Sequence, residues 1–212
     1  MRIIVSLVAL LALAPLRGEA APVVLGTDTL LLGGMPIAEN TQALAQPFTL
    51  TSSVSVTAID VFLIGGPLIT DPLLVQLTNS LGPGTTNSNV LLNTSLAPSG
   101  VPTSPPGAIV SFPVSITLTP GSYYIVLSTT DIWGYDWAEA LNVPPSAVGT
   151  VGQAMSCCFP NTVGSIPAAE TFKVAKSGPA DKFYFGLEGV PEPSSAALFA
   201  FGILLVAARR KS

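Results

Sequence analysis

The chain has 212 residues, of which only 9% are charged, and it contains no histidine. The absence of histidine excludes Ser-His-Asp and Cys-His catalytic arrangements and histidine-based metal sites. Residues 21–189 hold ten carboxylates against three lysines, so the basic surface that nucleic-acid binding requires is missing. We therefore expect no nucleic-acid partner, no metal or other cofactor, and no enzymatic activity.

The N-terminal segment MRIIVSLVALLALAPLRGEAAPVV has the layout of a secretory signal peptide. Arg2 precedes an apolar stretch over residues 3–16, and the small residues Gly18 and Ala20 follow at the spacing of a cleavage pair. This pattern predicts a signal helix over residues 1–20, delivery to the export translocase, and cleavage between Ala20 and Ala21. A buried first helix of a globular core is the alternative.

The first half of the remaining chain predicts several short strands. Residues 47–66 alternate between apolar and polar side chains, but the apolar phase slips at Ala58–Ile59, which predicts a β-bulge or a change of packing environment. The segments DPLLVQLTNS, residues 71–80, and NVLLNTSL, residues 89–96, predict two further strands. The proline-rich segment at residues 97–107 predicts a loop.

The clearest strand signal is at residues 110–118. Apolar side chains occupy every second position there, and Pro113 falls on the polar phase, which predicts an edge strand. Pro120-Gly121 predicts a turn, and Tyr123, Ile125 and Leu127 then resume the alternation. The pattern predicts a β-hairpin formed by these two strands.

The segment DKFYFGLEG, residues 181–189, predicts a last strand. No stretch between residues 21 and 189 keeps a helical period for a dozen residues. Short strands separated by turn signals predict an all-β fold: a single extracytoplasmic antiparallel β-sandwich, jelly-roll-like domain over residues 21–189.

Both tryptophans lie in the segment DIWGYDWAEA. If this segment is extended, Trp133, Tyr135 and Trp137 share one face at a ring spacing of about 6.6 Å. Such a row is a candidate glycan platform, but large aromatic side chains more often fill a core. The nearby acids Asp131, Asp136 and Glu139 are a candidate calcium site, but their spacing matches no calcium loop, so we do not expect one.

The only cysteines, Cys157 and Cys158, are adjacent. An exported protein with two cysteines normally forms a disulfide, but adjacent cysteines fit usual disulfide geometry poorly. Three alternatives stay open: a disulfide between the two residues, two free thiols, or bridges to another chain.

The C-terminal segment VPEPSSAALFAFGILLVAARRKS combines three features. The motif Val190-Pro191-Glu192-Pro193-Ser194 leads into an apolar run over residues 194–208, and the basic cluster Arg209, Arg210 and Lys211 follows. A 15-residue helix is about 22 Å long, so the run predicts a short transmembrane helix whose terminal cations snorkel and stay on the cytoplasmic side. A buried C-terminal helix is the alternative.

These three features together resemble the PEP-CTERM sorting signal. The resemblance covers residues 190–212 and implies that the motif is recognised by an exosortase, a membrane-embedded cysteine transpeptidase or protease of Gram-negative bacteria. The two prolines disfavour helix and keep the motif extended, and Glu192 is the one charge that a receptor can read there.

The strand order of residues 23–189 resembles the choice-of-anchor β-sandwich domains that often precede such tails. The resemblance implies no catalytic residues. We expect an exported structural or adhesion protein, passing from an inner-membrane precursor to the cell surface or extracellular matrix. The alternative is a surface-tethered carbohydrate-binding module that acts on exopolysaccharide through its aromatic row.

Overall fold

The computed structural model describes residues 22–37, 42–66, 68–103, 106–130, 134–157, 166–175 and 182–192. Within these ranges, β-strands are joined by turns and by three short 3-10 helices at Asn87–Asn89, Pro98–Gly100 and Pro167–Ala169. The prediction of an all-β fold is confirmed for this part of the chain. The predicted signal helix over residues 1–20 and the predicted membrane helix over residues 194–208 lie outside the described residues.

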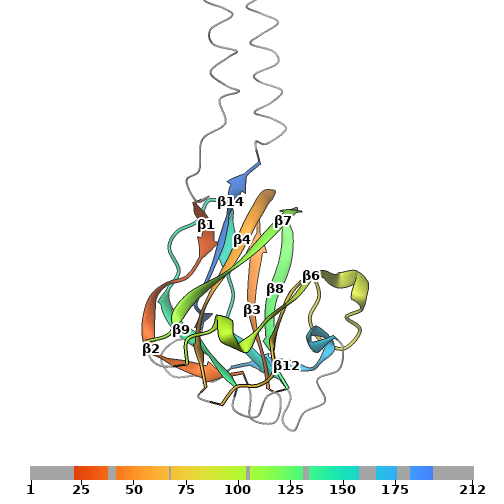
Figure 1. The fold of residues 1–212 in the computed structure, drawn as a ribbon. Helices are drawn as coiled ribbons and strands as arrows, with labels where there is room; N and C mark the ends of the chain where they lie inside the picture. The colour runs from red at the N-terminus through yellow and green to blue at the C-terminus, as the bar shows by residue number, and fades with distance from the viewer. Residues whose placement is uncertain are drawn as a thin grey trace, which may run out of the picture.

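The strands pair into two antiparallel sheets (Figure 1). Sheet A contains β1 Val23–Gly26, β2 Asp28–Pro36, β4 Val54–Gly65, β7 Ala108–Leu118, β9 Tyr135–Asn142, β13 Lys182–Phe183 and β14 Phe185–Pro191. Sheet B contains β3 Ala43–Leu50, β5 Leu73–Thr78, β6 Val90–Leu96, β8 Gly121–Ser128, β10 Gly149–Val151, β11 Met155–Cys157 and β12 Phe172–Val174.

Strand β4 organises sheet A. It pairs with β7 along one edge, and with β14 and then β9 along the other. Its register with β7 shifts between Val56 and Ala58, so the irregularity that the sequence predicts at Ala58–Ile59 is present. Among the described strands β7 pairs only with β4, and Pro113 is exposed, which confirms the predicted edge position.

The predicted hairpin over residues 110–127 is wrong in its pairing. Both strands and the turn between them exist, but β7 belongs to sheet A whereas β8 pairs with β3 and β5 in sheet B. The turn at Thr119–Pro120 therefore carries the chain from one sheet to the other. Alternation and turn residues predict that two strands follow each other, but they do not determine whether the strands share hydrogen bonds.

One hydrophobic core lies between the two sheets and draws large side chains from both. The ring of Phe48 on β3 stacks on Tyr123 of β8 at a centroid distance of 5.6 Å and on Phe185 of β14 at 5.8 Å. The second contact crosses between the sheets. The predicted apolar phases are confirmed here, because Ile125, Leu127 and Leu187 are fully buried. The arrangement of two sheets around one core is compatible with the predicted sandwich.

Candidate functional site

The predicted sorting motif begins inside the last strand. Strand β14 includes Val190 and Pro191, which pair with Ser55 and Val54 on β4. Both residues are therefore extended, as the proline content of the motif predicts. Proline has no amide hydrogen, which suits it to the end of a strand. The motif residues Pro193 and Ser194 lie outside the described residues.

Glu192, the single charge of the motif, is held by the adjoining strands. Its backbone N–H donates to the Ser53 carbonyl oxygen at 3.0 Å. Its Oε1 accepts from the Ser55 hydroxyl at 2.8 Å and from the Thr117 hydroxyl at 3.3 Å. Ser55 lies on β4 and Thr117 on β7, where they are paired residues with hydroxyl oxygens 3.2 Å apart. The side chain therefore spans two strands of sheet A.

The N-terminal strand lies directly beside this site. Strand β1 pairs with β14 through Val23 and Glu188, and the Gly189 N–H donates to the Pro22 carbonyl oxygen at 3.1 Å. The start of β1 and the end of β14 are thus at the same end of the molecule (Figure 1). The predicted signal cleavage site, Ala20 and Ala21, lies outside the described residues, but Ala21 immediately precedes Pro22 in the sequence.

The aromatic row does not form a glycan platform in the described residues. Tyr135 is 1% exposed and Trp137 is fully buried. The Trp137 ring stacks on Phe183 at 4.7 Å and donates from Nε1 to the Tyr184 carbonyl oxygen, while the Tyr135 hydroxyl donates to the Asp71 carbonyl oxygen. The two residues share a face, as predicted, but that face is the core side. Trp133 lies outside the described residues.

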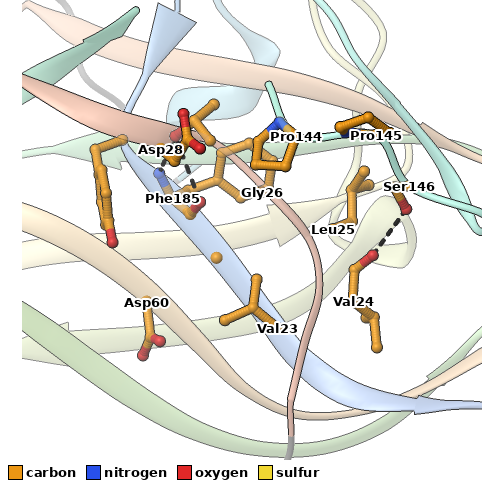
Figure 2. Close-up of a pocket in the computed structure, with 13 residues that line it drawn as sticks. Val23, Val24, Leu25, Gly26, Asp28, Asp60, Pro144, Pro145, Ser146 and Phe185 are labelled. Carbon is orange, nitrogen blue, oxygen red and sulfur yellow. Dashed lines mark hydrogen bonds between the residues drawn. The ribbon is translucent and has the colours of Figure 1, made fainter. Parts of the chain in front are cut away.

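A pocket of about 300 Å³ opens beside β1 and the first residues of β14 (Figure 2). Its walls combine the adjacent prolines Pro144 and Pro145 with Tyr184 and the carboxylates of Asp28 and Asp60. Burial raises the pKa of the Tyr184 hydroxyl, and the charges of Asp60 and Asp28 raise it further. No motif in the sequence marks this pocket, because its walls come from segments that are far apart in the chain.

The described acids of the candidate calcium site, Asp136 and Glu139, do not converge. Asp136 and Glu139 lie three residues apart on β9, so strand alternation places their side chains on opposite faces of the sheet. Burial raises the pKa of Asp136 above its usual value. Asp131 lies outside the described residues, within which no group of three or more Cys, Asp or Glu side chains gathers as a metal site would require.

Cys157 ends strand β11 and packs into a small cluster with Ala43, Ala45 and Val126 of sheet B and with Ala168 of the 3-10 helix Pro167–Ala169. It is 7% exposed and disulfide-bonded, which contradicts the alternative of two free thiols. The other cysteine of the chain, Cys158, lies outside the described residues.

Ser53, Ser55 and Thr117 are the contact residues that sequence reasoning missed. They occupy polar positions in or beside strands, where hydroxyl side chains are unremarkable in any exported β-protein. Only the register of β4 with β7 and β14 brings them to Glu192. One sequence signal points to Thr117: the odd-numbered residues 111–117 lie on the same, solvent-facing side of β7.

In the ranges that the structure describes, no helix is long and apolar enough to cross a membrane. The predicted apolar run and the basic cluster Arg209, Arg210 and Lys211 lie beyond those ranges.

A family model described as the PEP-CTERM protein-sorting motif matches residues 189–211. No curated protein matches the chain. The matched segment begins at Gly189, within β14, and includes the Pro-Glu-Pro motif and the basic cluster. A motif of this kind indicates an exported protein that an exosortase processes. The chain therefore carries a PEP-CTERM protein-sorting motif at residues 189–211, continuous with the last strand of a two-sheet β domain.

Proposed function

We propose that the chain is a structural or adhesive protein of the surface or extracellular matrix of a Gram-negative bacterium. In this proposal the signal peptide of residues 1–20 directs export, and the β domain of residues 21–189 folds as a sandwich outside the inner membrane. The apolar run of residues 194–208 holds the precursor in that membrane until exosortase acts on residues 190–194.

The PEP-CTERM match at residues 189–211 is the observation that carries this proposal. The arrangement of the two terminal strands supports it. Because β1 and β14 are paired, both predicted membrane-directed segments attach at one end of the domain. A precursor inserted through both segments would meet the bilayer with that single end, and the rest of the body would be free on the outer side.

A non-catalytic role is part of the proposal. Its support comes from composition, because the chain has no histidine and few charges to act as general acids or bases. A carbohydrate-binding role through the aromatic row lacks support, because the side chains of Tyr135 and Trp137 are buried in the core. A structural protein needs only a stable fold and a route of export to the cell surface.

The test compares the full chain with a Glu192→Ala variant in a host that carries an exosortase, with Glu139→Ala as a carboxylate control on β9. We expect the wild type and the control to lose both termini, as measured by intact mass. The Glu192→Ala variant should keep its C-terminal segment and remain in the inner membrane. Equal mature mass and localisation for all three chains would contradict exosortase recognition of this motif.

A further inference from the structure

The end of sheet A forms a small binding site for a carboxylate, and its occupant is the chain's own sorting motif. The Ser55 and Thr117 hydroxyls converge on one oxygen of Glu192, at 2.8 and 3.3 Å. We call these two hydroxyls the hydroxyl clamp. The Glu192 N–H is also engaged, by the Ser53 carbonyl oxygen at 3.0 Å. The side chain and the backbone N–H of Glu192 are thus both hydrogen-bonded within the domain.

The residues just before Glu192 are held as well. Val190 and Pro191 continue the ladder of β14 with β4 down to the pair of Pro191 and Val54. A protease that binds its substrate as an extended segment needs free backbone and side-chain groups on that segment. In this structure residues 190 and 191 are already paired with β4, and the Glu192 N–H and carboxylate already form hydrogen bonds within the domain.

The sequence leaves almost no linker beyond the clamp. Only Pro193, Ser194 and Ser195 separate Glu192 from the uninterrupted apolar residues that begin at Ala196. The four residue steps from Glu192 to Ala196 span at most about 14 Å when fully extended. If the apolar residues from Ala196 onward lie in a bilayer, the end of sheet A is therefore held within that distance of the membrane surface. An enzyme embedded in the membrane cannot reach the motif by drawing out slack chain.

We propose that the hydroxyl clamp shields the sorting motif in the folded domain, so that the end of β14 must detach from β4 before exosortase can bind Glu192. This inference rests on the proposed function. The clamp contacts are exposed, so water competes with them and their strength is modest. Detachment of residues 190–192 is thus a frequent local opening that leaves the core intact. The rate of processing is then proportional to the fraction of molecules in which the end of β14 is detached from β4.

The test removes the hydroxyls and keeps the strands. The variant is Ser55→Ala/Thr117→Val in the full chain. The matched control is Ser122→Ala/Thr49→Val, because Thr49 and Ser122 form an exposed cross-strand hydroxyl pair at 3.4 Å on sheet B. Both double variants lose the same atoms from an exposed sheet surface. Thermal unfolding of each chain verifies that both remain folded.

The first measurement is hydrogen exchange of a peptide that covers Glu192, on unprocessed chain from a host without exosortase. Removal of the clamp should accelerate exchange at that amide on the order of three- to ten-fold, with no change in the control. The second measurement is a pulse-chase rate of processing in a host with exosortase. The clamp variant should be processed faster by a similar factor, and the control at the wild-type rate.

Unchanged exchange at Glu192, or processing that is unchanged or slower in the clamp variant, would overturn the shielding while leaving exosortase processing in place. If the wild-type chain is never processed in the presence of exosortase, the proposed function fails and the role assigned to the clamp fails with it. Faster exchange together with faster processing supports both.

Discussion

Gln46 and Phe183 connect the two sheets through a buried hydrogen bond. The Phe183 backbone N–H on β13 of sheet A donates to Oε1 of Gln46 on β3 of sheet B at 2.7 Å. Gln46 is fully buried, and its Nε2 donates to the carbonyl oxygens of Pro47 and Gly152. A buried amide whose polar atoms are all engaged fixes how two apolar surfaces align, because any sliding would break its bonds.

Replacement of this side chain should destabilise the domain. Gln46→Leu has similar volume but leaves the Phe183 N–H without its acceptor, at a cost of about 1–3 kcal/mol. The control is Gln76→Leu on β5, which is also buried but whose Oε1 has no hydrogen-bond partner within the described residues. Urea unfolding of the full chain in detergent, monitored by circular dichroism, measures the free energy of unfolding of both variants. Equal losses in the two variants would contradict a specific role for Gln46.

Trp137 should act as a core residue with no part in ligand binding. Trp137→Ala removes a fully buried ring that stacks on Phe183, so we expect a loss of about 3–5 kcal/mol in the free energy of unfolding. Leu141→Ala on the same strand is the control, because Leu141 is 44% exposed and should change stability by less than about 0.5 kcal/mol. A stable Trp137→Ala variant that loses affinity for a glycan would restore the platform hypothesis.

The sequence predicted strand phases better than strand partners. Val110 to Leu118 alternate as expected, and their apolar side chains do face the core side. The predicted pairing of β8 with β7 is wrong, because the turn residues Pro120-Gly121 are compatible both with a chain that folds back within one sheet and with a chain that crosses to the other sheet. Alternation also placed Tyr135 and Trp137 on one face correctly. It could not tell the core side from the solvent side, because that depends on which sheet lies opposite.

The sorting motif was predictable, whereas its attachment was not. Pro-Glu-Pro, the apolar run and the basic cluster are contiguous, so a single stretch of sequence contains the signal. The contacts of Glu192 join residues 75 and 137 positions apart in the chain. Register between distant strands decides such contacts, and hydroxyl residues are too common in β-proteins to mark them in advance.

Gly189 should be intolerant of any side chain. A Cβ atom at this position would clash with the Ser55 carbonyl oxygen, at the register shift between Glu188 and Gly189. Gly189→Ala should therefore push β14 from β4 and destabilise the domain by about 1–3 kcal/mol. In Gly186→Ala, on the same strand, the new atom would meet its nearest neighbours at 3.5 Å, an ordinary contact. Similar unfolding midpoints for the two variants would contradict this account of the strand pairing.

The disulfide of Cys157 should be visible by alkylation. Because Cys157 is bonded and Cys158 is the only other cysteine, iodoacetamide should add nothing to the denatured, unreduced chain and two groups after reduction. Intact mass before reduction distinguishes the two remaining alternatives. A monomer mass indicates a bond within the chain, and a dimer mass indicates a bridge between chains. Alkylation without reductant would contradict the bonded state.

Asp136 should make the domain less stable as the pH rises towards neutrality. Burial raises the pKa of this carboxyl in the folded state above its usual value of 3.8, so the folded chain holds the proton more tightly than the unfolded chain does. The contribution to stability is complete below pH 3.8 and is lost as the pH rises through the folded pKa. Asp136→Asn removes the ionisation. The variant should therefore unfold at a higher temperature than the wild type at pH 7, and the difference should shrink as the pH falls below 3.8. A difference that is the same at both pH values would show that the substitution acts through packing or hydrogen bonding instead of through charge.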